Sequence, residues 1–255
     1  MELNSAPDPI DLGLVTGTFG DGSYEVEIQD ESGRININNA SEEQLRALME
    51  ACGIPKPDGD TIVDSILDWR DPDNLHRMNG AEQDFYQSLS PPYGVKNGRF
   101  DTVEELLLVR GVTREYFYGF AEKTPEGEVT HRFGLCRYVT VYSLGGMRVN
   151  INYAPLQVLL SIPALPPPVA QMIFERRKVK PFETLEEITK ELPATAGATA
   201  LPYLSTDQTG VYTLTVRARR ESARVTRLIR AVVSLDPREQ TKYKILYWNE
   251  NVPVL

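Results

Sequence analysis

The sequence contains few of the residues with which enzymes and metal-cluster proteins carry out their chemistry. Its 255 residues include only 2 histidines and 2 cysteines. Neither His76 nor His131 stands beside a serine or cysteine nucleophile in the sequence. A Gly-rich phosphate loop, a G-x-S-x-G turn and an H-E-x-x-H pair are missing as well. The sequence therefore predicts a protein that is not an enzyme.

Long apolar runs and an excess of basic residues are also missing. No run approaches the ~18 apolar residues of a membrane-spanning helix. The 27 Lys and Arg residues against 36 Asp and Glu residues give a net charge of −9, which argues against a nonspecific nucleic-acid binder. Hydrophobic residues make up 41% of the chain and charged residues 25%, as in ordinary globular proteins. One large domain or two modest ones are expected, at roughly 100–200 residues per domain.

The two cysteines allow two interpretations. Cys52 and Cys136 lie 136 − 52 = 84 residues apart, too far for a C-x-x-C redox or zinc motif. They are either two buried free thiols or a single disulfide formed in an oxidising compartment. The sequence does not choose between these alternatives.

The sequence does contain an internal repeat. The segment RININNA at residues 34–40 recurs as RVNINYA at residues 148–154. A second pair follows, FDTVEEL at residues 100–106 and FETLEEI at residues 182–188. The first pair is a short alternating strand that leads into a helix, and the second is a capped helix start with glutamates in its first turn. These repeats predict a duplicated helical unit.

The residues between the repeats have the apolar spacing of helices. Ser41 and Gln44 predict a capping box at the start of the first helix. Pro155 is predicted to lie in the first turn of the equivalent helix of the second copy, where a missing N–H does no harm. Three further apolar stripes at helical spacing predict helices around residues 62–69, 103–109 and 169–173.

The two ends of the chain have the alternation of strands instead. Residues 24–28 alternate, and from Gly210 onward VYTLTVRARR, a turn at Glu221 and Ser222, ARVTRLIRAVVSL and KYKILYW indicate an antiparallel sheet with one face in water. The first strand cannot be stable alone. We therefore predict an α+β fold, in which a helical domain of two related lobes, residues 38–204, is inserted into a small β-rich domain formed by residues 1–37 and 205–255.

Acidic residues crowd a stretch between residues 64 and 84 that also contains Pro, Asn and Gly. Hard oxygen ligands on a flexible loop are what calcium selects, with 6–8 oxygens at roughly 2.3–2.6 Å. The spacing D-x-x-D-x-D matches part of a calcium loop, without the glycine and glutamate positions of an EF-hand. Solvated loop charge is the alternative interpretation. The predicted calcium ligands are Asp68, Asp71, Asp73, Glu82 and Asp84.

The repeats are also similar to tandem helix-hairpin-helix modules, which bind phosphates through the backbone N–H groups of a Gly-rich hairpin. At the hairpin position the first copy has GIPKPDG, residues 53–59, and the second has IPALPPP, residues 162–168. Proline lacks the N–H that this contact requires. Only residues 109–113 come near the hairpin pattern. A nucleic-acid-binding protein derived from such modules is the alternative function, although nucleic acid is not expected as a partner.

Several segments together carry a resemblance to a known family. They are ESGRININNA, LDWRDPD, GAEQDFY, SPPYG, EELLLVRGV and RVNINYAP. Their order, with Asn97 between the P-P-Y and E-L segments, resembles that of the K-type minor pseudopilin of the bacterial type II secretion system. The resemblance runs from about Glu31 to the C-terminal strands.

The resemblance implies a pseudopilin-like fold and a structural, non-enzymatic role. Members of the family are anchored in the inner membrane by an N-terminal hydrophobic helix, which this sequence lacks, and their bodies lie in the periplasm. They assemble with I-type and J-type minor pseudopilins at the pseudopilus tip, where they help to initiate assembly and protein export. The secretin or an exported substrate is a further candidate partner.

The resemblance also implies calcium binding in the helical domain. One residue departs from the family pattern, because Gln83 stands where the family usually has Asp after G-A-E. Asp84 could substitute for it with a different geometry. A metal-dependent enzyme that uses the same acidic cluster is a third, weaker hypothesis.

Overall fold

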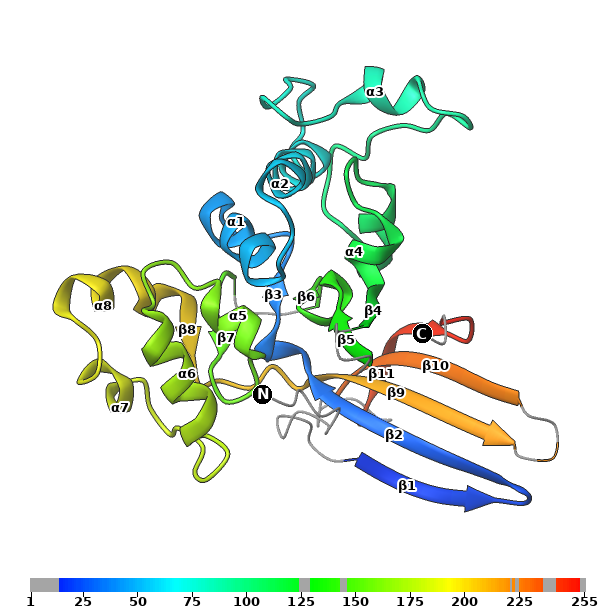
Figure 1. Cartoon of the computed structure of the whole chain (residues 1–255), viewed down its shortest axis with the longest axis vertical. Coiled ribbons are helices and arrows are strands. Elements are labelled where there is room, and N and C mark those ends of the chain that lie inside the picture. The colour runs from blue at the N-terminus through cyan, green and yellow to red at the C-terminus, as the bar shows by residue number, and fades with distance from the viewer. Residues whose placement is uncertain are drawn as a thin grey trace.

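The computed structural model describes residues 14–123, 129–142, 146–220, 222, 225–235 and 242–252. It combines a five-stranded antiparallel sheet with two helical lobes, the first of which also contains the antiparallel pair β4 (Gly119–Lys123) and β5 (Val129–Phe133) (Figure 1). The prediction of an α+β fold is therefore confirmed. The first thirteen residues of the predicted β-rich domain, and Glu221 of the predicted turn, lie outside the described residues.

The sheet consists of strands from both ends of the chain. In spatial order they are β1 (Leu14–Phe19), β2 (Gly22–Asp30), β9 (Val211–Arg220), β10 (Val225–Ser234) and β11 (Lys244–Asn249). Every neighbouring pair is antiparallel. The central pair joins β2 to β9, with Asp30 opposite Tyr212. The helical part is thus inserted between two strands that pair directly with each other.

Lobe 1, residues 35–140, begins and ends at a short parallel pair, β3 (Ile35–Asn36) with β6 (Val139–Thr140). Its other elements are α1 (Glu42–Ala51), α2 (Lys56–Arg70), α3 (Gln83–Gln87), η2 (Val103–Leu108), α4 (Arg114–Tyr118), β4 (Gly119–Lys123), β5 (Val129–Phe133) and η3 (Leu135–Arg137).

Lobe 2, residues 149–205, is closed by an equivalent parallel pair, β7 (Val149–Asn150) with β8 (Leu204–Ser205). Its other elements are α5 (Leu156–Leu160), α6 (Pro167–Arg176), α7 (Glu186–Thr189), α8 (Ala194–Ala200) and η4 (Leu201–Tyr203). The chain leaves β2 through a single 3₁₀ turn, η1 (Glu31–Gly33), to enter lobe 1. The predicted domain boundaries at residues 38 and 204 stay a prediction.

The two lobes share hydrogen bonds as well as sequence. In lobe 1 the Asn38 side chain accepts from the Phe100 N–H at 2.7 Å and donates to the Phe100 carbonyl at 3.0 Å. In lobe 2 the Asn152 side chain accepts from the Phe182 N–H at 2.7 Å and donates to the Phe182 carbonyl at 2.9 Å. Each repeated asparagine therefore ties the strand of its repeat to the distant F-x-T segment of the same lobe.

The helix starts differ in detail from the predicted ones. Ser41 caps α1 by accepting from the Gln44 N–H at 3.1 Å, but the Gln44 side-chain amide is buried without a hydrogen-bond partner among the described residues. Only half of the predicted capping box therefore forms. A complete capping box joins Thr102 and Glu105, at the start of a 3₁₀ helix. Pro155 is the N-cap of α5, one position before the predicted first turn.

The sheet and both lobes meet at η1. The Glu31 carboxylate is buried and accepts from the Thr213 hydroxyl of β9 at 2.5 Å, and it pairs with Arg34 at 2.7 Å. A Cβ atom on Gly33 would lie 2.4 Å from the carbonyl carbon of Tyr153 in lobe 2, so this close approach requires glycine. Residues 31–34 thus form a joint that holds three parts of the molecule together.

We predict that Thr213→Val destabilises the chain through this joint. The substitution keeps the shape of the side chain but removes the donor to a buried carboxylate, which costs about 1–3 kcal/mol. Thr215→Val, on the same face of β9 but only half-buried, is the matched control and is expected to change stability by less than about 0.5 kcal/mol. Urea denaturation measures both, and equal stability of the two variants would contradict the prediction.

Most of the buried apolar side chains lie in the lobes. An aromatic cluster in lobe 1 includes Trp69 near the end of α2, which meets Tyr86 edge-on at 5.2 Å and stacks with Phe100 at 6.3 Å between ring centroids. Tyr86 lies in α3, so this cluster fixes the end of α2 against α3. The loop that joins these helices, with the adjoining ends of both helices, holds the acidic residues singled out above.

The two cysteines are free thiols, so the structure supports this alternative and not the disulfide. Burial raises the pKa of the Cys52 thiol to about 12 and also raises the pKa of the Cys136 thiol. Both thiols are therefore protonated and unreactive at neutral pH. Within the part of the chain that the structure describes, no helix has the length and apolar character to span a membrane.

Candidate metal centre

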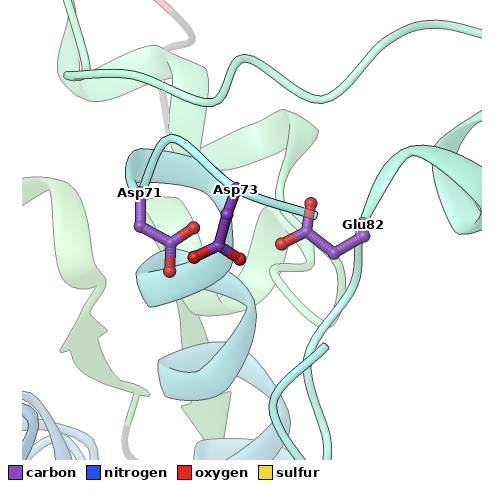
Figure 2. Close-up of side chains that lie close together, drawn as sticks. All are labelled: Asp71, Asp73 and Glu82. Atoms are coloured by element: carbon purple, nitrogen blue, oxygen red, sulfur yellow. The ribbon is translucent and has the colours of Figure 1, made fainter. Parts of the chain in front are cut away.

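Three carboxylates converge between the end of α2 and the start of α3. Asp71 is the C-cap of α2, Asp73 follows in the loop, and Glu82 is the N-cap of α3. One oxygen from each lies within 4.8 Å of the others. Figure 2 shows the Asp73 carboxylate between those of Asp71 and Glu82. We call these three residues the carboxylate cluster.

The cluster has oxygen atoms that the protein leaves unpartnered. Glu82 is only 1% exposed, yet neither of its carboxylate oxygens has a hydrogen-bond partner among the described residues. Asp71 Oδ1 and Asn97 Oδ1 are buried and unpartnered in the same way. A buried carboxylate without a partner is strongly unfavourable unless a cation or a proton compensates it. This burial argues against solvated charge for Glu82, whereas Asp73 is exposed and Asp71 is half-buried.

Two further carboxylates on α2 hold the loop in place. Asp64 accepts from the Asn79 backbone N–H and from its side-chain amide, both at 3.0 Å. Asp68, one turn later, accepts from the Arg77 N–H at 3.3 Å and pairs with the Arg77 guanidinium at 3.4 Å. A Cβ atom on Gly80 would lie 1.8 Å from Asp68 Oδ2, so only glycine lets the loop come this close.

Of the five predicted ligands, the structure brings three together and places two elsewhere. Asp68 is fully buried beneath the loop and is occupied by the contacts with Arg77 described above. Asp84 is 74% exposed and pairs with His76 at 3.0 Å. Neither belongs to the group of oxygens within 4.8 Å of one another, which contains Asp71, Asp73 and Glu82.

Asn97, which contacts this loop, was not among the predicted ligands. Its side-chain amide donates to the Asp73 carbonyl at 2.8 Å and to Asn74 Oδ1 at 3.1 Å, which leaves the Asn97 Oδ1 atom buried without a partner. Its φ of 47° lies in the left-handed region, which asparagine tolerates better than most residues. The only feature of the sequence that singled out Asn97 was its position between the P-P-Y and E-L segments of the family resemblance.

Burial, and to a lesser extent neighbouring carboxylates, raises the pKa of Glu82, Asp71 and Asp68. Burial, together with the nearby Asp68 and Asp71 carboxylates, raises the pKa of Glu82 to about 7. Burial and the neighbouring Asp73 raise the pKa of Asp71, and burial with Asp71 raises the pKa of Asp68. The negative charge of three ionised carboxylates is therefore poorly compensated by the protein, and a bound cation would compensate it.

These donors fit calcium. Calcium takes 6–8 hard oxygen ligands with flexible geometry, and three carboxylates can supply up to six oxygens of this kind. The Asn97 amide oxygen would add a neutral ligand of the same hardness. The donor set contains no sulfur or imidazole, the ligands that zinc and copper prefer.

A pH dependence follows from the raised pKa of Glu82. In the unfolded chain a glutamate has a pKa of about 4.3, so between that pH and about 7 the folded state binds more protons than the unfolded state. Without metal, stability is therefore greater at the low end of this window and is lost as the pH rises through it. We expect a metal-free chain to melt at a higher temperature near about pH 5.5 than near about pH 7.5.

We expect Glu82→Gln to remove much of this difference in melting temperature between the two pH values. The matched control Glu50→Gln, at an exposed position of α1, is expected to retain it. Thermal melts in chelator at the two pH values test the prediction. A melting temperature of the parent chain that rises with pH over this window would contradict it.

The one hairpin-like segment, residues 109–113, is largely exposed, but its glycine lies close to α2. Gly111 has a φ of +86°, and a Cβ atom there would lie 3.1 Å from the Ile62 side chain of α2. The glycine therefore serves the contact between this turn and α2. The positive φ and this close contact explain why a glycine stands at position 111. A phosphate ligand is not needed to explain it.

The sequence of this chain is similar to those of known proteins. The family model described as "Type II secretion system (T2SS), protein K" matches residues 24–119, which include the carboxylate cluster. Type II secretion system protein K of Pseudomonas aeruginosa is 27% identical over 183 residues, which are 67% of this chain and 49% of that protein. The protein of the same name from Pectobacterium carotovorum is 26% identical over 151 residues, 56% of this chain and 41% of that protein.

The fold also matches a solved structure. A chain in the crystal structure of the GspK-GspI-GspJ complex from the enterotoxigenic Escherichia coli type 2 secretion system superposes with a TM-score of 0.69 and 15% identity. The match covers 94% of this chain and 84% of that one, so the sheet and lobes follow a known arrangement. The chain spans about half the length of the curated relatives it matches or less, 49% and 41% of the two named above.

Proposed function

This chain belongs to the type II secretion system protein K family, and from that premise we propose that it is the tip-building body of a minor pseudopilin. In this role the protein is a structural component that helps to initiate the pseudopilus and to drive export across the outer membrane. The observation that carries the proposal is the family match over residues 24–119, the stretch that leaves the sheet and builds most of lobe 1.

The proposed partners are the I-type and J-type minor pseudopilins. Support comes from the solved complex, whose description names three such proteins together and whose fold this chain shares over 94% of its length. A contact with the secretin or with an exported substrate is a further part of the proposal. The nucleic-acid alternative has no support from the comparisons, and its hairpin glycine has a structural reason in its close approach to α2.

The proposed location is the periplasm, with the parent protein anchored in the inner membrane by a segment before the body described here. The support for this location is family membership. Free cysteines with raised pKa values are chemically compatible with that compartment, because thiols that stay protonated react slowly.

Calcium is the proposed ligand of the carboxylate cluster, and its proposed role is structural. The cluster spans the two ends of the loop between α2 and α3, so a cation that bridges Asp71 and Glu82 ties those helices together. Buried, unpartnered oxygens on both residues support this proposal.

A mixing experiment tests the assembly role. The chain is combined with the soluble parts of the I-type and J-type proteins of the same organism, and the mixture is followed by sedimentation velocity. We expect a complex of one copy of each at micromolar concentrations. Three separate species at about 100 μM of each protein, weaker than typical specific complexes, would contradict the proposal.

A further inference from the structure

Strand β1 forms one edge of the sheet and is paired on one side only. It is the outermost strand in Figure 1, and it pairs with β2 in unbroken register from Leu14 opposite Glu27 to Phe19 opposite Gly22. Among the described residues, no strand pairs with its other side. The outward N–H and C=O groups of such a strand are a template for a further strand.

The sequence of β1 lacks the devices that usually protect an edge. Its six residues, LVTGTF, include no charged residue and no proline. Val15 is 51% exposed and Phe19 is 87% exposed. The opposite edge, β11, begins with Lys244, and its pairing with β10 is interrupted by a register shift. Charge and irregularity of that kind discourage pairing, so the two edges of this sheet differ in their readiness to accept a strand.

The two faces of the sheet define what kind of strand fits beside β1. On one face Val15, Val26 and Val216 lie opposite one another in a row that continues to Ile229 of β10. This apolar row stops at the open edge. Gly17 keeps the edge flat there, because a Cβ atom on it would lie 2.4 Å from the Tyr24 hydroxyl oxygen.

The other face is polar and acidic. Thr16 lies opposite Glu25, and Leu14 lies opposite Glu27. Strand β9 pairs with the other side of β2. In that pairing Arg217 lies opposite Glu25, and Thr215 lies opposite Glu27. A strand with alternating apolar and hydroxyl or basic residues therefore already matches one side of β2.

We propose that the outer edge of β1 receives an extended strand from a partner protein, which adds a sixth strand to the sheet. The incoming strand has apolar side chains toward Val15 and Phe19 and hydroxyl or basic side chains on the acidic face. Main-chain hydrogen bonds provide the affinity and the alternation provides the specificity. A second copy of this chain fits less well, because each copy carries a net charge of −9 and β1 has no basic residue to offset it.

The test uses the full chain and a synthetic peptide of residues 211–219, VYTLTVRAR, which has the required alternation. Fluorescence anisotropy measures binding of the labelled peptide, and amide hydrogen exchange locates it. We expect the exchange of alternate β1 amides to slow by about tenfold or more at saturating peptide. A peptide with proline in place of Thr215 is expected to bind at least about tenfold more weakly, because proline removes a strand donor.

Matched variants of the chain test the side-chain requirement. Val15→Lys places a charge at the open edge and is expected to weaken peptide binding about tenfold. Val225→Lys, at a 44% exposed position of β10 away from that edge, is expected to bind within about twofold of the parent chain.

Three results would overturn the proposal. They are no binding at about 1 mM peptide, exchange protection that falls on β11 instead of β1, and equal weakening by the two lysine variants. If the parent chain forms concentration-dependent dimers and Val15→Lys abolishes them, the strand comes from a second copy of this chain. That result would overturn the proposal of a different partner protein. None of these results bears on the complex with the I-type and J-type proteins, which is measured separately.

Discussion

We expect calcium to raise the melting temperature of the chain by about 5–10 °C when it is present at about one hundred times its dissociation constant. A ligand at that level stabilises the folded state by about 2.7 kcal/mol. For a chain of this size each kcal/mol shifts the melting temperature by roughly 2–4 °C. The physical cause is the carboxylate cluster, whose buried oxygens on Asp71 and Glu82 have no other partner among the described residues.

Three variants make this expectation specific. Asp71→Asn, inside the cluster, is expected to remove most of the calcium response. Asp101→Asn is the matched control, because its side chain is 83% exposed and pairs with Lys96 instead. Asp84→Asn tests the fifth predicted ligand. Because Asp84 contacts His76 and lies outside the cluster, we expect the calcium response to survive this substitution. Differential scanning calorimetry with calcium, with magnesium and with chelator measures all three.

The same calorimetry could contradict the calcium proposal in two ways. A melting temperature unchanged by chelator and by added calcium would mean that the cluster holds no calcium at these concentrations. A response that Asp71→Asn leaves intact would place the cation elsewhere. Either result would leave the assembly role untouched, because that role rests on the family match and the fold.

We expect Asn38→Ala and Asn152→Ala each to lower the free energy of unfolding by about 2–6 kcal/mol. Each asparagine makes two hydrogen bonds to the backbone of a buried phenylalanine, Phe100 in lobe 1 and Phe182 in lobe 2. Truncation removes both bonds and leaves a backbone N–H and C=O without partners, at about 1–3 kcal/mol for each such group. Because the geometry is repeated, we expect similar losses in the two lobes.

Asn39→Ala is the matched control for this pair. Asn39 is the neighbour of Asn38, but its side chain makes only long, exposed bonds: it donates to the Gly146 carbonyl at 3.5 Å and accepts from the Arg99 guanidinium at 3.4 Å. We expect this variant to stay within about 0.5 kcal/mol of the parent chain. Urea denaturation of the four proteins gives the comparison. A large loss for one asparagine and none for its counterpart would show that the two lobes do not share this tie.

The sequence predicted the features that depend on neighbouring residues. The alternation of Leu214 and Val216 with Thr213 and Thr215 predicted strand β9, because a strand turns successive side chains to opposite faces. The repeated R-x-N-x-N-x-A segments predicted two related lobes, and their asparagines make the same bonds in each. The insertion itself followed from a simple requirement, that a single strand near residues 24–28 needs partners from elsewhere in the chain.

The acidic site was predicted in part, because its geometry depends on contacts between residues that are distant in the sequence. Asp68 and Asp84 have the same side chain as Asp71, and spacing alone could not separate them. The difference arises because Arg77 folds back over Asp68 and His76 reaches Asp84. Gln44 shows the same limit, since the S-x-x-Q pattern predicted a capping contact and the amide is instead buried.

The insertion also orders the events of folding. The central pair of the sheet joins β2 to β9, and the contact between Glu31 and Thr213 spans 182 residues of sequence. Closing so long a loop from an unfolded chain carries an entropy cost, whereas folded lobes hold its two ends together in advance. Contacts within each lobe are more local and form sooner. The sheet is therefore completed last, and during synthesis β2 waits for its partner while both lobes fold.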